Sequence, residues 1–259
     1  MNPPGTNPFL FSGTVALITG GTSGIGQATV AALARAGALV CYVGRRRELG
    51  EEQAKELRSE GLRVEYVYAD VTREDEIRQA VVQTVERHGR LDFAINNAGL
   101  EADPHWLVET SEADFRKVLD VNVLGTFLSM KHEIPALRAS GGGCIVNVAS
   151  VLGQVAMAQL APFVAAKHAV IGLTKTAALE QAHHNIRVNA VAPGAVDTGM
   201  LWRTVHESQQ NFNKISSLHP MGRVATADEV AAAILWLCSE GAGFVTGHIL
   251  NVDGGYTAQ

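Results

Sequence analysis

A glycine-rich stretch near the start of the chain has the residue types and spacing to bind phosphate. Residues 19–26 are Thr-Gly-Gly-Thr-Ser-Gly-Ile-Gly, between the apolar run 15–18 and an alanine-rich segment that begins at residue 28. A β-branched run that turns at glycines into a helix presents free backbone N–H groups and a positive helix end to an anion. The pattern predicts a nucleotide-phosphate site, with a ligand-free turn as the simpler alternative.

Each glycine of this turn has its own expected role. Gly20 allows the sharp turn, Gly24 lets a pyrophosphate approach bare backbone, and Gly26 lets the helix pack closely on the strand. We therefore expect the turn to contact a nucleotide cofactor through Gly20, Thr22, Ser23, Gly24, Ile25 and Gly26.

Basic residues follow the second predicted strand. Eighteen residues beyond the last glycine of the turn stands Gly44, followed by Arg45, Arg46 and Arg47. A carboxylate at this strand end would bond ribose hydroxyls and repel a phosphate, whereas a guanidinium grips a phosphate with a planar fork. The chain therefore favours NADP(H) over NAD(H). Arg45 is the first candidate for the phosphate contact and Arg46 the second, and Arg47 is better explained as a solvated helix start.

The three residues between Gly20 and Gly24 make a wide spacing that resembles the short-chain dehydrogenase/reductase family. Residues 96–99, Asn-Asn-Ala-Gly, match a signature of that family, and residues 193–198 match its segment that brackets the nicotinamide carboxamide. The resemblance extends from about residue 14 to residue 255. It implies cofactor contacts by Asp70, Val71, Asn97, Ala98, Gly99, Lys167, Pro193, Gly194, Val196 and Thr198.

The same resemblance implies a catalytic group with one departure from the family pattern. Carbonyl reduction places negative charge on the substrate oxygen, so the site needs a proton donor and hydrogen bonds aimed there. The family uses Ser, Tyr and Lys, with an Asn that positions a proton-relay water, and Ser150, Lys167 and Asn122 match these. Phe163, thirteen residues after Ser150 and one helical turn before Lys167, stands where the family has tyrosine.

The absent hydroxyl leaves three interpretations open. The first is an introduced Tyr→Phe change in an NADP(H)-dependent enzyme that transfers hydride between nicotinamide and a carbonyl or alcohol; family-like residues around position 163 favour it. Such a change would cost about 10²–10⁴ in rate. The second is a natural phenylalanine enzyme that reduces an imine or an activated enone, which needs no proton at that oxygen. The third is a non-catalytic NADP-binding sensor or interaction protein.

From residue 14 onward, short β-branched runs alternate with longer helical patterns. Strands so separated pair in parallel through right-handed crossovers, which predicts an α/β fold with one Rossmann-type doubly wound sheet of about seven strands. We expect a single domain over 13–259 after a flexible leader at 1–12. Strands are predicted at 15–19, 39–43, 63–68, 91–95, 144–148, 186–191 and 248–252, and helices up to 36 and at 48–60, 74–88, 111–139, 161–183 and 227–239.

The bulk composition limits the partners and the location. A net charge of −5 without a basic block gives no support to a nucleic-acid or membrane partner. No signal peptide or membrane-spanning run is recognisable. Three distant cysteines in apolar contexts indicate free buried thiols in a reducing compartment, so we expect a cytoplasmic protein.

The histidines give no expectation of a metal site. His183 and His184 are the only adjacent pair, and neighbouring helical side chains point in different directions. His105, His206 and His219 fall in loops near the expected pocket. One of them could replace the missing proton donor, although surface or packing roles explain each of them more simply.

Residues 197–223 form a long segment that we expect to act as a substrate lid. Together with residues after Ser150, its apolar members predict a small apolar or cyclic substrate; packing of the lid on the body is an equal alternative. These residues are Met200, Leu201, Trp202 and Phe212 in the lid and Val151, Leu152, Val155 and Met157 after Ser150. The helices around Asn122 and Lys167 are apolar on more than one face, and the family resemblance implies a homotetramer.

Overall fold

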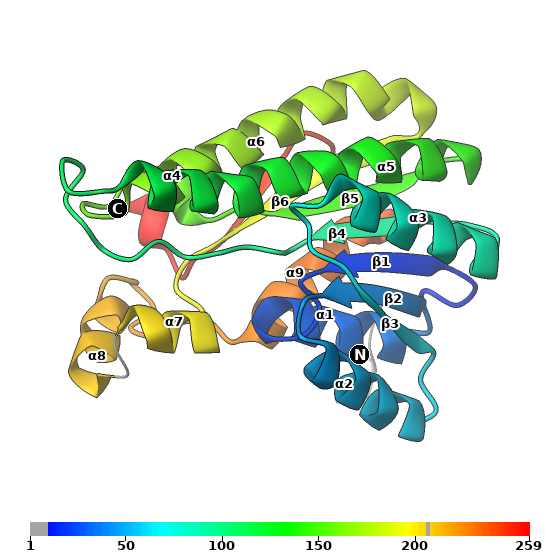
Figure 1. Ribbon diagram of the computed structural model, residues 1–259, viewed down its shortest axis with the longest axis horizontal. Helices are drawn as coiled ribbons and strands as arrows, with labels where there is room; N and C mark the ends of the chain where they lie inside the picture. Colours follow the sequence, from blue (N-terminus) through cyan, green and yellow to red (C-terminus); the bar gives the residue numbers. More distant parts are fainter. Residues whose placement is uncertain (1–9, 206–207) are drawn as a thin grey trace.

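Seven short, apolar segments form one parallel sheet in the order β3-β2-β1-β4-β5-β6-β7 (Figure 1). The computed structural model describes residues 10–205 and 208–259. Ala16 on β1 pairs with Val40 on β2 and with Phe93 on β4, so β1 is a central strand. The strands are β1 (Val15–Thr19), β2 (Leu39–Gly44), β3 (Val64–Tyr68), β4 (Phe93–Asn96), β5 (Gly143–Val148), β6 (Ile186–Pro193) and β7 (Ile249–Val252).

Helices cover both faces of the sheet. In Figure 1, α1, α2 and α9 lie on one face and α3, α5 and α6 on the other, as right-handed parallel crossovers require. The predicted doubly wound α/β fold is therefore confirmed. The helices are α1 (Gly24–Arg35), α2 (Arg47–Ser59), α3 (Glu74–His88), α4 (Glu112–Leu119), α5 (Gly125–Ala139), α6 (Ala161–Gln181), α7 (Gly199–Thr204), α8 (Gln209–Ser217) and α9 (Ala227–Cys238).

Two apolar layers hold the helices on the sheet. Successive strand residues point to opposite faces, so Ile18 joins the layer that contains Leu33 of α1, and Leu17 joins the layer that contains Ile77 of α3. All four side chains are buried. Burial of one such side chain stabilises the fold by about 1.5–3 kcal/mol, and the two layers together fix the strand ends where the predicted site residues lie.

The helix predicted at 111–139 is interrupted. α4 ends at Leu119, a π-helical turn spans Asp120–Leu124, and α5 continues from Gly125. The apolar pattern of residues 111–139 predicts one helix and does not predict this turn. Such turns occur often at functional sites, and this one contains Asn122.

The packed body includes residues before the predicted domain boundary at residue 13. Phe11 is buried, its backbone N–H donates to Ala36 O at 2.8 Å, and its ring meets Phe93 edge-on at 5.1 Å between centroids. Residue 11 therefore belongs to the packed body and not to a flexible leader. Residues 1–9 of that predicted leader lie outside the described residues.

The predicted lid is largely helical. α7 and α8 stand apart from the two helical layers, beyond the ends of the strands (Figure 1). Trp202 and Phe212 stack on each other with centroids 4.6 Å apart, and Leu201 and Val205 are buried with Val224 in a small separate core. The apolar side chains of the predicted lid therefore pack mainly on one another.

Two expectations about the chain's surroundings can be compared with the structure. Cys41, Cys144 and Cys238 are buried and unpaired, as the sequence indicates. Within residues 10–205 and 208–259, no helix combines the length and the apolar character needed to cross a lipid bilayer.

Candidate functional site

One cavity of about 610 Å³ collects the predicted site residues at the carboxyl ends of the strands. Ligands of open parallel sheets bind at this edge. The lining includes Gly20, Thr22, Ser23, Gly24, Ile25, Arg45, Arg46, Asp70, Val71, Asn97, Ala98, Gly99, Asn122, Ser150, Phe163, Lys167, Pro193, Gly194, Val196 and Thr198. Of the residues predicted for the site, Gly26 alone is not part of this lining.

The glycine turn has the backbone that its sequence predicts. Gly20 has a φ of +66°, and a Cβ there would lie 2.8 Å from the Ala98 Cα. A Cβ on Gly26 would lie 2.2 Å from Gly20 O, so Gly26 supports the turn from beneath instead of facing the cavity. The Asn97 side chain braces the same turn, because its Nδ2 donates to Thr19 O at 3.2 Å and to Gly20 O at 2.9 Å.

The N-terminus of α1 is open toward the cavity. Ser23 precedes the helix in an extended conformation, its side chain makes no capping hydrogen bond, and the first turn contains no acidic residue. The first N–H groups of a helix lack partners within the helix and carry its positive dipole end. This helix end can therefore receive an anionic group.

The three arginines after β2 have different surroundings. Arg46 Nη2 donates to Thr22 Oγ1 at 3.0 Å and to Ser23 Oγ at 2.5 Å, directly over the glycine turn. Arg45 Nη1 lies 3.5 Å from Asp70 Oδ2. Arg46 therefore contacts the glycine turn, whereas Arg45 contacts Asp70, and both arginines line the cavity. Arg47 lies over the Tyr68 ring, away from the cavity lining.

The Asp70 carboxylate is oriented by Thr72 and Arg45, and the residue directly before α3 is Arg73. Its Oδ1 accepts hydrogen bonds from Thr72 N at 3.0 Å and from Thr72 Oγ1 at 2.8 Å. Burial raises the pKa of this carboxyl, but the Thr72 hydrogen bonds and the Arg45 charge outweigh burial and hold the pKa below its usual value. Asp70 is thus an anchored carboxylate at the end of β3.

Lys167 and Phe163 face the cavity from one side of α6. Lys167 is buried, its Nζ donates to Val148 O at 2.8 Å, and it lies 5.4 Å from the centre of the Phe163 ring. Burial lowers the pKa of Lys167 to about 8. The Phe163 ring packs against Val118 and Ala166. Phe163 and Lys167 therefore lie on one face of α6, as the sequence predicts, and the Phe163 ring occupies the position where the resemblance implies a tyrosine.

Ser150 and Asn122 complete the predicted catalytic group. Ser150 Oγ accepts from Leu152 N at 3.1 Å, which leaves the hydroxyl hydrogen free to donate. Asn122 lies in the π-helical turn and binds the loop after β4 at both ends of its amide: Nδ2 donates to Leu100 O at 2.9 Å, and Oδ1 accepts from Leu100 N at 3.3 Å. A Cβ on Gly99 would lie 3.0 Å from Asn122 Oδ1 and 3.7 Å from Lys167 Nζ.

Two features of the cavity are not evident from the sequence. Arg203 of α7 pairs with Glu101, with Nε 2.8 Å from Oε1, and both residues line the cavity. This ion pair links the lid to the loop after β4. His219 is buried at the other end of the lid, where its Nε2 accepts from Ala195 N at 3.0 Å. Both contacts join segments distant in sequence, so no local pattern signals them.

Part of the predicted substrate surface lies at the cavity. Its members in the lining are Val151, Leu152, Met157, Met200 and Leu201, whereas Val155, Trp202 and Phe212 are outside it. The packing alternative therefore holds for Trp202 and Phe212, which stack on each other. Of the loop histidines, His219 lines the cavity, His105 is exposed outside it, and His206 lies outside the described residues.

A doubly wound sheet with a glycine turn, a buried lysine and a nearby serine defines a nucleotide-binding oxidoreductase site. A family model described as Enoyl-(Acyl carrier protein) reductase matches residues 20–257. The chain belongs to the short-chain dehydrogenase/reductase family, as the following relatives also show.

Curated relatives span almost the whole chain. 2,5-dichloro-2,5-cyclohexadiene-1,4-diol dehydrogenase of Sphingobium indicum is 43% identical over 95% of this chain and 98% of its own. A-factor type gamma-butyrolactone 1'-reductase (1S-forming) of Streptomyces virginiae is 45% identical over 96% and 97%. Cyclohexanol dehydrogenase of an Acinetobacter species is 38% identical over 96% and 97%. The chain is thus similar to two proteins that are named alcohol or diol dehydrogenases and to one that is named a reductase.

Solved structures of the family have the same fold. A tyrosine-to-phenylalanine variant of ElxO with NADPH bound has a TM-score of 0.89 and 37% identity, covering 95% of this chain and 99% of that chain. 3-ketoacyl-(acyl-carrier-protein) reductase from Brucella melitensis complexed with NADH also has a TM-score of 0.89, with 33% identity over 95% and 99%. Relatives of this fold therefore bind either nicotinamide cofactor.

Proposed function

We propose that this protein is an NADP(H)-dependent oxidoreductase that transfers hydride between nicotinamide and a small ring-bearing alcohol or carbonyl compound, and that Phe163 slows this reaction. The observation that carries the proposal is the placement of Phe163 and Lys167 on one face of α6, beside Ser150 and Asn122 in one cavity. Relatives named for cyclohexanol and a cyclohexadienediol support a cyclic substrate, as do the apolar Leu152, Met157 and Leu201 in the lining.

The residues present fit a phosphorylated dinucleotide. The glycine turn lies at the cavity edge with Gly20, Thr22, Ser23 and Gly24 in the lining, α1 offers an open N-terminus, and Arg46 lies over the turn. Asp70 and Val71 would hold the adenine end, and Val196 and Thr198 the nicotinamide end. When bound, the cofactor supplies or accepts the hydride.

The chain's own groups would then bind and polarise the substrate oxygen. Ser150 has a free hydroxyl hydrogen to donate to that oxygen, because its Oγ already accepts from Leu152 N. The Lys167 ammonium gives one of its three N–H groups to Val148 O and keeps two for the cofactor ribose. The Phe163 ring has no proton to give. Since a general acid contributes about 10²–10⁴ in rate, we expect weak carbonyl reduction.

A second candidate function is favoured by one contact. The Lys167 ammonium lies over the Phe163 ring at a distance at which a cation is attracted to a ring face, so the phenylalanine has a favourable role of its own. A natural enzyme with this pair would reduce an iminium, which already carries positive charge, or an activated enone. Hydride transfer alone is then sufficient.

The variant Phe163→Tyr tests the proposal. We expect it to reduce a cyclic ketone with NADPH about 10²–10⁴ times faster than the unchanged chain, while NADPH binding stays similar. Phe244→Tyr adds the same hydroxyl at a fully exposed position and serves as the control. Equal rates for the unchanged chain and Phe163→Tyr would reject the impaired-enzyme proposal. In that case, activity on a cyclic imine favours the second candidate, and binding without any turnover favours a sensor.

We also propose a homotetramer located in the cytoplasm. Leu124, Phe127 and Leu179 are exposed on the helices that carry and flank the catalytic residues, and exposed apolar residues of this kind mark interaction surfaces. The three buried, unpaired cysteines are consistent with a reducing compartment. Light scattering of the purified protein tests the assembly: a tetramer is expected, and a monomer at micromolar concentration would contradict it.

A further inference from the structure

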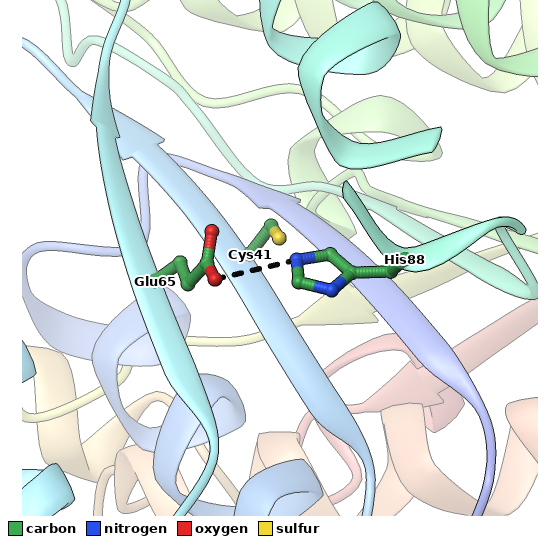
Figure 2. A group of neighbouring side chains, drawn as sticks. All are labelled: Cys41, Glu65 and His88. Carbon is green, nitrogen blue, oxygen red and sulfur yellow. Dashed lines mark ion pairs between the residues drawn. The ribbon is translucent and has the colours of Figure 1, made fainter. Parts of the chain in front are cut away.

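Three side chains with different ligand atoms converge on the sheet face that α3 covers. Cys41 comes from β2, Glu65 from β3 and His88 from the last residue of α3 (Figure 2). One sulfur, one carboxylate oxygen and one ring nitrogen lie within 4.8 Å of one another. None of the three residues lines the cavity described above. The cluster is therefore separate from the proposed reaction site.

Glu65 and His88 each place one atom close to the Cys41 sulfur. Arg87 Nη1 donates to Glu65 Oε2 at 3.0 Å, which orients the carboxylate and leaves Oε1 at 3.4 Å from His88 Nε2. His88 Nε2 is buried and makes no hydrogen bond with any residue that the structure describes. The contact with Glu65 Oε1 is an ion pair only when the ring is protonated, and a buried polar atom that lacks a hydrogen bond is costly. In the neutral tautomer that carries its proton on Nδ1, the Nε2 lone pair is available to a ligand.

We propose that Cys41, Glu65 and His88 bind one Zn²⁺ ion, with water as the fourth ligand. A thiolate, an imidazole and a carboxylate form the mixed N, S and O set that zinc accepts in tetrahedral sites. On binding, the Cys41 thiol releases its proton to solvent and a Zn–S bond forms, while the neutral His88 ring binds through Nε2. No oxidation or reduction takes place.

The required movement is small. Zinc–ligand bonds of about 2.0–2.3 Å place the ligand atoms of a tetrahedral site roughly 3.3–3.8 Å apart. The three atoms within 4.8 Å of one another therefore need to approach by about 1 Å. Glu65 and His88 keep 29% and 13% of their side chains exposed, which gives an ion a path from solvent.

A bound ion would join three elements at once. Cys41 belongs to β2 and Glu65 to β3, and these strands continue to Gly44 and to the segment before Asp70 at the cavity edge. His88 closes α3 onto the same pair of strands. β3 ends the sheet, and among the strands in residues 10–205 and 208–259 it pairs with β2 alone. The ion would therefore fix the outer strand pair and raise the thermal stability of the protein.

Only the fold brings these three residues together. The sequence prediction of no metal site considered adjacent histidines, and His183 and His184 do form a local pair with ring centroids 4.0 Å apart. The proposed ligands lie on three different elements, and no motif with short spacing contains them. The cofactor proposal and the zinc proposal are independent of each other.

Cobalt(II) substitution tests the site, since a thiolate ligand gives a charge-transfer band and a tetrahedral ion gives strong visible bands. We expect the untagged, reduced protein to bind one Co²⁺ per chain with both signatures, and Zn²⁺ to displace it. Cys41→Ser should lose the charge-transfer band, and His88→Gln should bind at least about tenfold more weakly. Cys238→Ala and His184→Gln remove a buried thiol and an imidazole elsewhere and should keep the signal.

Specific results would overturn the proposal. Absence of the charge-transfer band in the unchanged protein at millimolar Co²⁺ would do so, as would a band that persists in folded Cys41→Ser. If Cys41→Ser does not fold, the Co²⁺ affinity of His88→Gln tests the site instead. The His88 side chain is partly exposed, so its replacement disturbs the core less. In that variant, unchanged Co²⁺ affinity contradicts the site. A Zn²⁺-dependent rise in the unfolding temperature, present in His184→Gln and absent in His88→Gln, supports it.

Discussion

Lys167 directs its ammonium at the face of the Phe163 ring, 5.4 Å from the ring centre, while donating to Val148 O. One turn of α6 therefore presents a cation and an aromatic ring to the cavity, with no acidic hydroxyl between them. Lys167 thus provides a cation at the nicotinamide end of the proposed site, and Phe163 provides no proton donor. Cofactor binding and carbonyl reduction should consequently be separable in this protein.

The charge of Lys167 predicts a pH dependence of cofactor binding. Burial lowers its pKa to about 8, so the ammonium is lost as the pH rises through that value. We expect NADPH affinity to fall between pH 7 and pH 9.5 in the unchanged chain and to vary much less in Lys167→Met. Calorimetry at three pH values measures this. Lys175→Met, at an exposed position of the same helix, is the control and should behave as the unchanged chain does.

Arg46 should decide the preference for the phosphorylated cofactor. Hydrogen bonds to charged groups are worth about 1.5–3 kcal/mol, so Arg46→Gln should weaken NADPH binding roughly 10–100-fold and leave NADH binding nearly unchanged. Arg47→Gln is the matched control, because that side chain packs on Tyr68 outside the cavity. A larger loss in Arg45→Gln than in Arg46→Gln would restore the order expected from the sequence.

The Arg203–Glu101 pair should slow the opening of the lid. The two side chains are 60% and 21% exposed, and exposed ion pairs contribute about 0.2–1 kcal/mol. We expect Glu101→Gln to release NADPH up to about fivefold faster in stopped-flow fluorescence. Glu112→Gln, which breaks an exposed pair with Arg116 away from the cavity, should have no effect. Equal release rates in all three proteins would mean that the pair does not hold the lid.

Glu133 predicts a pH dependence of stability. Its carboxyl is fully buried; Oε2 accepts from Asn96 Nδ2 at 3.0 Å. Burial raises the pKa of Glu133 from 4.5 to about 8. The stabilising contribution is therefore complete below pH 4.5 and is lost as the pH rises through about 8.

Glu133→Gln removes that titration. Relative to the unchanged chain, we expect the variant to gain free energy of unfolding as the pH rises from about 5 to about 8, by at most about 1.4 kcal/mol per pH unit. Urea unfolding at pH 5, 6.5 and 8 measures the difference. Exposed Glu86→Gln should show no such trend. A constant difference between Glu133→Gln and the unchanged chain would show that Glu133 is ionised in the folded protein.

Local patterns were sufficient for the sheet and for most of the cofactor cavity. The β-branched runs, the glycine turn and the Asn-Asn-Ala-Gly segment act through neighbours in sequence, and the structure brings these residues together as predicted. The contacts of Arg45 and Arg46 were not evident from the sequence, because Arg45 lies beside Asp70 and Arg46 beside Thr22, and both partners are distant in sequence. Phe11 was assigned to a leader because its packing partner, Phe93, is distant in sequence.

Other features depend on contacts that periodicity does not encode. The π-helical turn around Asn122 adds one residue to that turn of the helix. His219 accepts a hydrogen bond from Ala195, which is distant in sequence, and the cluster of Cys41, Glu65 and His88 comes from three elements. In each case the sequence supplies the residue types, and tertiary packing decides which of them meet.

Calorimetric titration of the unchanged protein with NADPH and with NADH tests the central claim most directly. One NADPH should bind per chain, at least about tenfold more tightly than NADH, because Arg46 lies over the open end of α1. Failure of both dinucleotides to bind would contradict the assignment of the cavity. Tighter binding of NADH would contradict the role given to the arginines after β2.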